Sequence, residues 1–196
     1  YKYGKKGGLW TGWHANGEKK YQGKYVDGKP DDLYTELDDR GRLTKSIEYN
    51  EGLVLTEYHI QRDESGTTEY HKRNGVLDGQ WTRWYKNGNK AEEGMYKDGK
   101  RSGEWNGWYR SSKKNFSCVY EDGKRAGNYI EWNSKGKKVK EIYYSEGKRI
   151  KEYLVIRDSN GFMEINKKYG KLDGSWSRWY ADGLKEEEGA YKNGTK

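Results

Sequence analysis

Residues 77–100 read L-D-G-Q-W-T-R-W-Y-K-N-G-N-K-A-E-E-G-M-Y-K-D-G-K, and this stretch decides the fold. Short runs rich in Trp, Tyr and Thr are bounded by Asn87-Gly88 and by Asp98-Gly99, and no proline interrupts them. Asn-Gly and Asp-Gly between such runs are the strongest short-range signals for a β-hairpin. Apolar residues at helical spacing do not persist beyond one turn. The stretch therefore predicts one antiparallel hairpin.

The same pattern recurs along the chain. When the sequence is aligned with itself at an offset of 95 residues, about 44 of 101 aligned positions are identical, and such a fixed period is the signature of a repeat architecture. We expect one repeat domain over residues 1–196, with about eight units of 23–24 residues and an internal duplication of residues 6–100 and 101–195. The leading aromatic residues of the units are Trp10, Tyr34, Tyr58, Trp81, Trp105, Tyr129, Tyr153 and Trp176.

If every unit is a hairpin, the chain is all-β. We predict an elongated, single-layer antiparallel sheet of tandem β-hairpin repeats, a solenoid of about 16 strands. Charged residues make up 36% of the chain and hydrophobic residues 31%, values that favour disorder, but aromatic residues make up 15% and disordered segments are poor in them. Because each large ring buries on the order of 150–250 Å², we expect a thin aromatic core.

The turn residues also predict which residues face each other. Asn and Gly tolerate the positive φ of a two-residue type I′ turn, so we place such a turn at Asn87-Gly88 and its equivalents. Large rings then lie opposite small residues, and Arg lies opposite Glu, both of which stabilise sheets. The predicted pairs are Tyr85–Lys90, Arg83–Glu92, Trp81–Gly94, Trp10–Gly23, Gly12–Tyr21, Trp105–Cys118, Gly107–Phe116, Arg178–Glu187 and Trp176–Gly189.

The pattern G-x-W-x-x-W-Y-x-x-G-x-K-x-x-x-G-x-Y-x-D-G-K resembles the MORN repeat family, in the bacterial variant found in YwqK-like antitoxin proteins. The resemblance implies a twisted single-layer sheet of hairpins with a shallow groove, and members act as protein-interaction scaffolds, membrane-associated modules or domains attached to enzymes. Units led by Tyr depart from the pattern, and residues 57–72 and 152–167 contain a different turn. The match is best at 8–29, 77–100, 101–124 and 172–194, and weaker at 31–76 and 125–171.

The sequence contains no constellation that indicates catalysis. It has no phosphate-binding loop and no nucleophile elbow, and its histidine spacing fits no zinc pattern. The single Cys118 excludes an internal disulfide. We expect no enzyme activity, no catalytic residue, no metal and no cofactor. The three histidines and the residues at the equivalent positions of the other block are His14 and Tyr109, His59 and Leu154, and His71 and Asn166.

The tryptophans are the first candidate binding residues. Exposed rings on a sheet can stack on sugars, bases or partner side chains. The alternative is that these rings are the core, because a single sheet has little else to bury. The candidate aromatic ladder is Trp10, Trp13, Trp81, Trp84, Trp105, Trp108, Trp132, Trp176 and Trp179.

Lysines near the turns are the second candidate. The net charge is +8, and a basic rim could dock on anionic lipid at roughly 1 kcal/mol per residue. The alternative is that these lysines keep the chain soluble and protect the sheet edges. The candidate basic rim is Lys19, Lys20, Lys113, Lys114, Lys137, Lys138, Lys167 and Lys168.

These features predict a non-enzymatic repeat scaffold that mediates protein–protein interaction with an unidentified protein partner. A secreted or bacterial surface location is favoured over the cytoplasm. The alternatives are peripheral binding to anionic membranes through the basic rim and glycan recognition by exposed Trp and Tyr. No nucleic-acid partner is expected. Since the chain opens at Tyr1, inside a repeat, we expect it to be part of a longer protein.

Overall fold

The computed structural model describes residues 4–195 and divides the chain into two compact units, Tyr1–Lys100 (unit 1) and Arg101–Lys196 (unit 2). The boundary coincides with the boundary of the predicted duplication. In the described residues all regular structure is β-strand, and no helix is long and apolar enough to cross a membrane. The predicted all-β fold of tandem hairpins is confirmed.

Unit 1 contains eight strands that follow each other in the sheet in sequence order. They are β1 (Gly8–Trp13), β2 (Lys19–Val26), β3 (Lys29–Leu37), β4 (Leu43–Asn50), β5 (Leu53–Asp63), β6 (Gly66–Arg73), β7 (Val76–Tyr85) and β8 (Lys90–Lys97).

Unit 2 repeats this arrangement, again with each strand antiparallel to the next. Its strands are β9 (Lys100–Trp108), β10 (Lys114–Glu121), β11 (Lys124–Trp132), β12 (Lys138–Ser145), β13 (Lys148–Asp158), β14 (Gly161–Lys168), β15 (Lys171–Tyr180) and β16 (Lys185–Tyr191).

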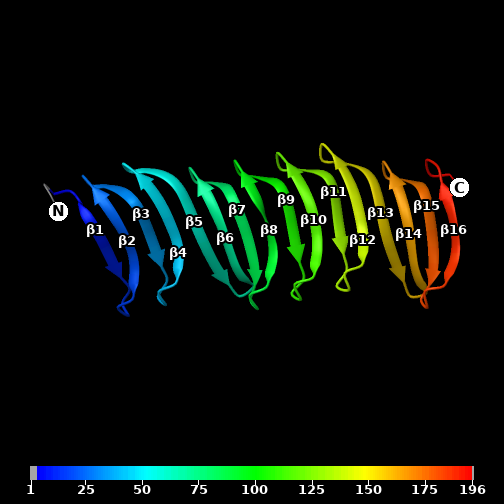
Figure 1. The fold of residues 1–196 in the computed structure, drawn as a ribbon, viewed down its shortest axis with the longest axis horizontal. Helices are drawn as coiled ribbons and strands as arrows, with labels where there is room; N and C mark the ends of the chain where they lie inside the picture. The colour runs from blue at the N-terminus through cyan, green and yellow to red at the C-terminus, as the bar shows by residue number, and fades with distance from the viewer. Residues whose placement is uncertain (1–3, 196) are drawn as a thin grey trace. The chain divides into compact units, whose positions relative to one another are not determined.

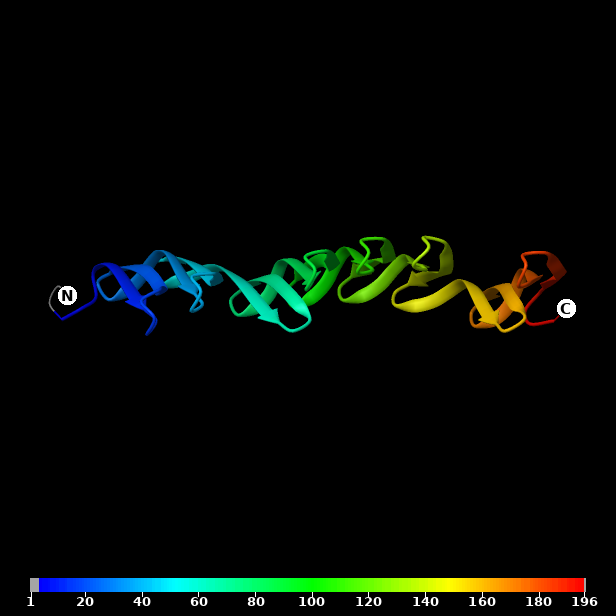
Figure 2. The ribbon, with the colours of Figure 1, turned by 90° about the horizontal axis from the view of Figure 1, so that it is seen from below.

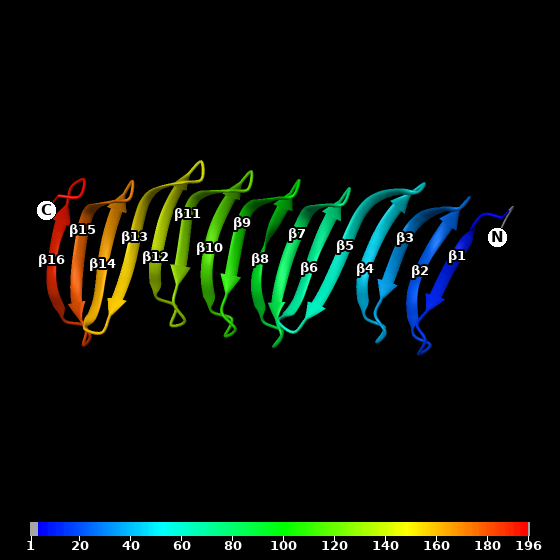
Figure 3. The same cartoon turned by 180° about the vertical axis from the view of Figure 1, so that it is seen from behind.

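Within each unit the strands form one open layer, as the view along the strand ends shows (Figure 2). The connections alternate between two edges of the sheet (Figures 1 and 3). The turns inside the hairpins, such as the one between β9 and β10, lie along one edge, which we call the loop edge. The turns that link successive hairpins, such as the one between β10 and β11, lie along the other, the join edge.

The turns at the join edge are the two-residue turns with positive φ. Asp122 and Gly123, for example, have φ of 48° and 79°. Positive φ at both residues defines the type I′ turn, whose twist matches that of the flanking strands. Asp-Gly pairs therefore link successive hairpins, as Asp27-Gly28 does between β2 and β3. Residue pairs of this kind are Asp27-Gly28, Glu51-Gly52, Asn74-Gly75, Asp98-Gly99, Asp122-Gly123, Glu146-Gly147 and Tyr169-Gly170.

The turn at Asn87-Gly88 differs from the prediction. Only Gly88 has positive φ, 83°, and the Gly88 N–H donates to the Tyr85 carbonyl at 2.9 Å. This is a three-residue loop, a turn followed by a left-handed glycine. Tyr85 therefore closes the loop with Asn89, with N···O of 2.8 Å, and the predicted Tyr85–Lys90 pair is wrong.

A second irregularity restores the predicted register further from the loop. Trp84 pairs with Lys90, but Arg83 pairs with Glu92, so Ala91 is a bulge residue. The extra loop residue and the extra strand residue compensate, and every other predicted pair is confirmed. The bulge recurs on the return strand of the equivalent hairpins. The bulge residues are Lys20, Thr44, Ala91, Asn115, Val139 and Glu186.

The two faces of each sheet differ in what they carry. Residues paired across strands share a face, and neighbours along a strand point to opposite faces. In unit 2, one face holds Trp105, Ile142, Ile165 and Trp176, all buried; we call it the core face. In unit 1 the core face carries Trp10, Tyr34, Ile47 and Trp81. The opposite face of each unit is the groove face.

Large core-face rings lie over a small residue of a neighbouring strand, which is the next strand for the leading tryptophans and the preceding strand for Tyr34 and Phe116. Trp105 is completely buried over Cys118, with Arg101 stacked on its indole at 3.8 Å. A Cβ atom added at Gly107 would lie 2.1 Å from the ring of Phe116. The small residue lets the ring lie flat on the sheet. Cys118 acts here as a small packing residue, as the sequence predicted.

The different turn predicted at residues 57–72 and 152–167 is present. β5 and β13 are the longest strands, with 11 residues each, and each ends in a two-residue turn. Gly161, after the turn in unit 2, has φ of 155°, and a Cβ there would lie 1.9 Å from the carbonyl oxygen of Trp179. Gly66 has the same surroundings in unit 1. These two positions require glycine.

The Gly161→Ala substitution should destabilise unit 2 by about 3 kcal/mol or more, because the side chain meets a backbone atom in a φ region reserved for glycine. Gly136→Ala is the matched control: its φ is 86° and no atom lies within 4 Å of the added Cβ, so it should cost only about 1 kcal/mol. Urea unfolding of both variants measures the difference. Equal losses would contradict the assigned clash.

Candidate binding grooves

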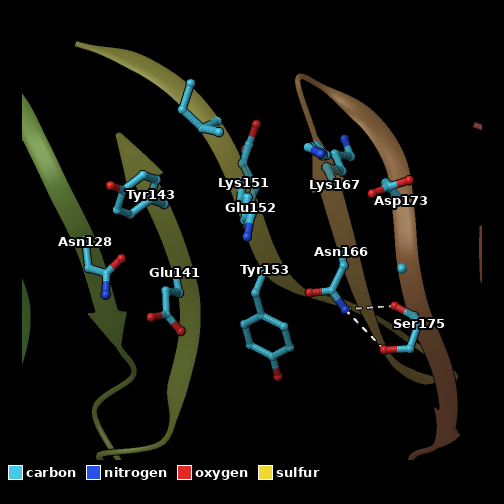
Figure 4. A pocket seen from close by; sticks show the side chains of 13 residues that line it. Asn128, Glu141, Tyr143, Lys151, Glu152, Tyr153, Asn166, Lys167, Asp173 and Ser175 are labelled. Carbon is cyan, nitrogen blue, oxygen red and sulfur yellow. Dashed lines mark hydrogen bonds between the residues drawn. The ribbon is translucent and has the colours of Figure 1, made fainter. Parts of the chain in front are cut away.

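A groove with a volume of about 770 Å³ lies on the groove face of unit 2. It is open to solvent and crosses β11 to β15. Figure 4 shows the ring of Tyr153 beside Asn166, with Tyr143 and Asn128 on neighbouring strands. The lining residues are Asn128, Glu141, Tyr143, Ile150, Lys151, Glu152, Tyr153, Asn166, Lys167, Lys168, Asp173, Gly174 and Ser175.

Unit 1 has a groove at the equivalent positions, in two adjoining parts of about 570 and 350 Å³ that share His71 and Gln80. Every residue in the following pairs is 95 positions from its partner, so the groove was duplicated with the fold. The equivalent lining residues are Thr56 and Lys151, Tyr58 and Tyr153, His71 and Asn166, Lys72 and Lys167, Arg73 and Lys168, Asp78 and Asp173, Gly79 and Gly174, and Gln80 and Ser175.

A break in the hydrogen-bond ladder accompanies each groove. Between β14 and β15 the register shifts from Ile165–Trp176 to Lys167–Leu172, which leaves extra residues bowed out of β15. Asn166 lies opposite this bow, and its Nδ2 donates to the carbonyl of Ser175 at 2.8 Å (Figure 4). The same break occurs between β6 and β7.

The equivalent bond in unit 1 uses a different side chain. His71 Nδ1 donates to the Gln80 carbonyl at 3.1 Å. A bowed segment leaves a backbone carbonyl without a ladder partner, and here the side chain opposite bonds that carbonyl. A ring nitrogen or an amide satisfies it equally well, so the substitution preserves the groove.

A second histidine also donates to a backbone carbonyl that a different side chain bonds in unit 2. His14 Nε2 donates to the Leu37 carbonyl at 3.0 Å, and the equivalent Tyr109 hydroxyl donates to the Trp132 carbonyl at 2.7 Å. His59 stacks on Tyr70 with ring centroids 5.0 Å apart, and its Nε2 donates to Glu57 at 3.0 Å. All three imidazoles therefore have local structural partners.

The tyrosines that lead the weaker units each lie beside a glutamate. Tyr58 donates its hydroxyl to Glu69 at 2.5 Å, and burial followed by this hydrogen bond raises the pKa of Tyr58 to about 12. In the equivalent position of unit 2, burial and the charge of Glu164 raise the pKa of Tyr153 to about 12. Tyr153 thus presents a neutral phenol to the groove near neutral pH.

The predicted aromatic ladder is divided between the two faces. Trp10, Trp81, Trp105 and Trp176 lie on the core face, where the last two are buried. These four rings therefore lie where the alternative interpretation in the sequence analysis placed them, in the core. The others lie on the groove face, because three residues along a strand reverse the direction of the side chain. The groove-face tryptophans are Trp13, Trp84, Trp108, Trp132 and Trp179.

Groove-face tryptophans pair with lysines. Trp84, Trp132 and Trp179 lie opposite Lys90, Lys138 and Lys185. The bulge places each lysine beside the acidic residue three positions later, and the Nζ to Oε2 distances are 2.5, 2.6 and 2.7 Å. Sequence reasoning missed this pairing, although the repeated K-x-x-E spacing could have indicated it.

The predicted basic rim is not one rim in unit 2. Lys113, Lys114, Lys137 and Lys138 lie at the loop edge, beside the turns that end β9 and β11. Lys167 and Lys168 lie at the opposite, join edge and line the groove. The prediction is wrong there because β14 ends at the join edge, whereas β9 and β11 end at the loop edge. Lys19 and Lys20 lie at the loop edge of unit 1.

The ion pairs of Arg178 do not follow the strand register. Glu187 lies opposite Arg178, as predicted, but Arg178 makes its ion pairs with Glu186 at 2.8 Å and Asp158 at 3.1 Å. Glu186 is the bulge residue, so its side chain can reach the same side as Arg178.

In the part of the chain that the structure describes, no three His, Cys, Asp or Glu side chains are grouped to hold a metal ion.

The position of each tryptophan predicts its contribution to stability. Trp105→Ala should cost about 3–5 kcal/mol, because it removes a fully buried ring, whereas Trp13→Ala should cost under about 1 kcal/mol, because Trp13 is 63% exposed. Chemical unfolding of the two variants is the measurement. A large loss from Trp13→Ala would show that its ring contributes to the core.

The lead tyrosines predict alkaline instability. Burial is the first cause that raises the pKa of Tyr34, Tyr58, Tyr129 and Tyr153 to about 12, above about 10 for an unfolded tyrosine. Their contribution is complete below pH 10 and is lost as pH rises through 12, because the unfolded chain releases its protons first. The melting temperature should fall over this window, and less steeply in Tyr58→Phe. A pH-independent melting temperature up to pH 12 would contradict this.

No protein-family model matches this chain, and no curated protein matches it. Membership of the MORN repeat family therefore stays a prediction.

Proposed function

We propose that this chain is a non-catalytic repeat scaffold of the MORN type that binds a protein partner along its groove faces. The observation that carries the proposal is the duplicated groove. Four of its lining residues are identical in the two units, and the side chains that differ at His71 and Asn166 hold the same carbonyl. A scaffold that has the same groove in both units is suited to a partner that carries similar binding segments more than once.

The lining favours a polypeptide. The groove of unit 2 combines cations and carboxylates, among them Lys151, Lys168 and Asp173, with the phenol of Tyr153. A peptide supplies both charges, backbone donors and acceptors, and apolar side chains that pack on an aromatic ring. The shallow, open form of the grooves suits an extended segment that lies across the strands.

Two observations support a non-catalytic role. His14 and His71 hold backbone carbonyls, so neither ring is arranged as a general base beside a nucleophile. Burial raises the pKa of the Cys118 thiol, which disfavours the reactive thiolate.

Glycan recognition is a second candidate, favoured by one feature of unit 2. Tyr143 is 46% exposed and lies opposite Asn128 on the neighbouring strand. An exposed ring beside an amide is a common arrangement for a sugar. Unit 1 has Glu48 and Leu33 at these positions, so this feature was not duplicated with the groove.

A peptide display library selected on the immobilised chain tests the proposal. Selected peptides, measured by fluorescence anisotropy, should lose about tenfold in affinity for the double variant Arg73→Glu/Lys168→Glu, because both grooves then carry a reversed charge. Lys86→Glu/Lys192→Glu is the matched control: the same charge change lies at exposed positions outside the grooves, and affinity should change less than about twofold.

Two results would contradict the protein-scaffold proposal. The first is equal binding of the selected peptides to both double variants. The second is failure to select peptides together with binding on a glycan array that Tyr143→Ala abolishes, which would establish the glycan candidate.

A further inference from the structure

The positive charge of this chain is concentrated in unit 2. Unit 1 contains 18 basic and 17 acidic residues, a net charge of +1, and unit 2 contains 21 basic and 14 acidic residues, a net charge of +7; together these give the +8 of the whole chain. Because the units share one fold, the difference reflects their side chains and not their architecture.

Two neighbouring loops at the loop edge hold most of this excess. The loops at 109–114 and 133–138 carry six cations and no carboxylate, whereas the equivalent loops 14–19 and 38–43 of unit 1 carry equal numbers of each. We call these six the loop cations; all are exposed. They are Arg110, Lys113, Lys114, Lys135, Lys137 and Lys138.

The backbone of these loops is the same in both units. Asn133 N–H donates to the Lys137 carbonyl at 2.9 Å, as Asp38 N–H donates to the Arg42 carbonyl at 2.8 Å. Asn133 Oδ1 accepts two loop N–H groups at 3.0 Å, as the carboxylate of Asp38 does in unit 1. The amide therefore keeps the loop folded without the negative charge.

From this we infer that the loop cations of unit 2 form a docking surface for an acidic polypeptide segment at the loop edge, where Lys138 adjoins the groove through Glu141 and Tyr153. In unit 1 the carboxylate of Asp38 is used internally, in an ion pair with Arg42 at 2.8 Å. In unit 2 the Asp-to-Asn difference removes that internal partner. Among the loop cations, Lys138 pairs with Glu141 at 2.6 Å.

The neighbouring aromatic rings favour a peptide over a nucleic acid or a glycan. The Lys114 Nζ lies over Trp132 at 5.5 Å, and Phe162 has Lys137 at 5.0 Å and Arg157 at 5.1 Å. Because cations already cover these rings, bases or sugars would have to displace them in order to stack. Recognition by charge alone needs no free ring face.

The loops also lack the apolar side chains that enter a bilayer. The single aromatic residue in the two loops is Tyr109, which is half-buried with its hydroxyl bonded to Trp132. Successive loops are two strands apart, about 9–10 Å, which matches the roughly 9 Å between every third side chain of an extended polyproline II segment. An acidic segment could thus place carboxylates on both loops.

A reciprocal exchange tests this inference, with a fluorescein-labelled deca-glutamate peptide as the probe. Lys113→Glu/Asn133→Asp/Ser134→Asp gives unit 2 the residues of unit 1, and Glu18→Lys/Asp38→Asn/Asp39→Ser does the reverse. The first variant should bind the peptide about tenfold more weakly, and the second about threefold or more tightly, than the unaltered chain. Binding to the unaltered chain should weaken about tenfold between 50 and 200 mM salt.

Circular dichroism confirms folding of both variants, and Lys113→Gln/Lys135→Gln, which leaves the loop hydrogen bonds intact, replaces the first if it fails to fold. Unchanged peptide affinity in folded variants overturns the inference. So does tighter binding, at 150 mM salt, of inorganic polyphosphate, a thymidine oligonucleotide or phosphatidylserine vesicles. Since Arg73 and Lys168 lie outside these loops, the groove variant should bind deca-glutamate almost as the unaltered chain does, which separates this site from the proposed grooves.

Discussion

The structure depends on large rings that lie flat on a sheet with no second layer above it. In a sandwich, apolar side chains of one sheet are buried by the other; here the side chains of neighbouring strands are the cover. Trp105 reaches complete burial only because Cys118 leaves room beneath it and Arg101 lies on its outer face. This requirement explains why the composition is rich in both aromatic residues and glycine, and poor in aliphatic residues.

The same requirement gives the two faces their different roles. Once the leading ring of a hairpin occupies the core face, the next tryptophan, three residues on, must lie on the opposite face. There it meets a lysine that a bulge has paired with a nearby carboxylate, as in Lys138 and Glu141. Departures from the regular ladder thus produce both the polar groove face and, between β14 and β15, the groove itself.

Most of the fold could be predicted from the sequence, because turn residues and ring–glycine pairs specify the register locally. Trp81–Gly94 was predicted correctly even though the turn at Asn87-Gly88 was not, since the loop and Ala91 each add one residue. The groove was not predicted, because it depends on a ladder break at the repeated Leu-Asp-Gly segments, and similar breaks between β2 and β3 and between β10 and β11 show that such a break does not by itself specify a groove. To predict the edge on which each lysine lies also required the direction of each strand, which the composition does not contain.

Duplication shows which features the fold requires and which it leaves free. Where a backbone carbonyl must be satisfied, the side chain changes but the bond remains, as with His14 and Tyr109. Where Asp38 and Asn133 hold the same loop, the bond remains but the charge does not. The two units therefore differ in net charge at positions where an uncharged residue makes the same hydrogen bonds as a charged one. Differences of this kind cost the fold almost nothing, which leaves these positions free to serve the docking role that we propose for the loop cations.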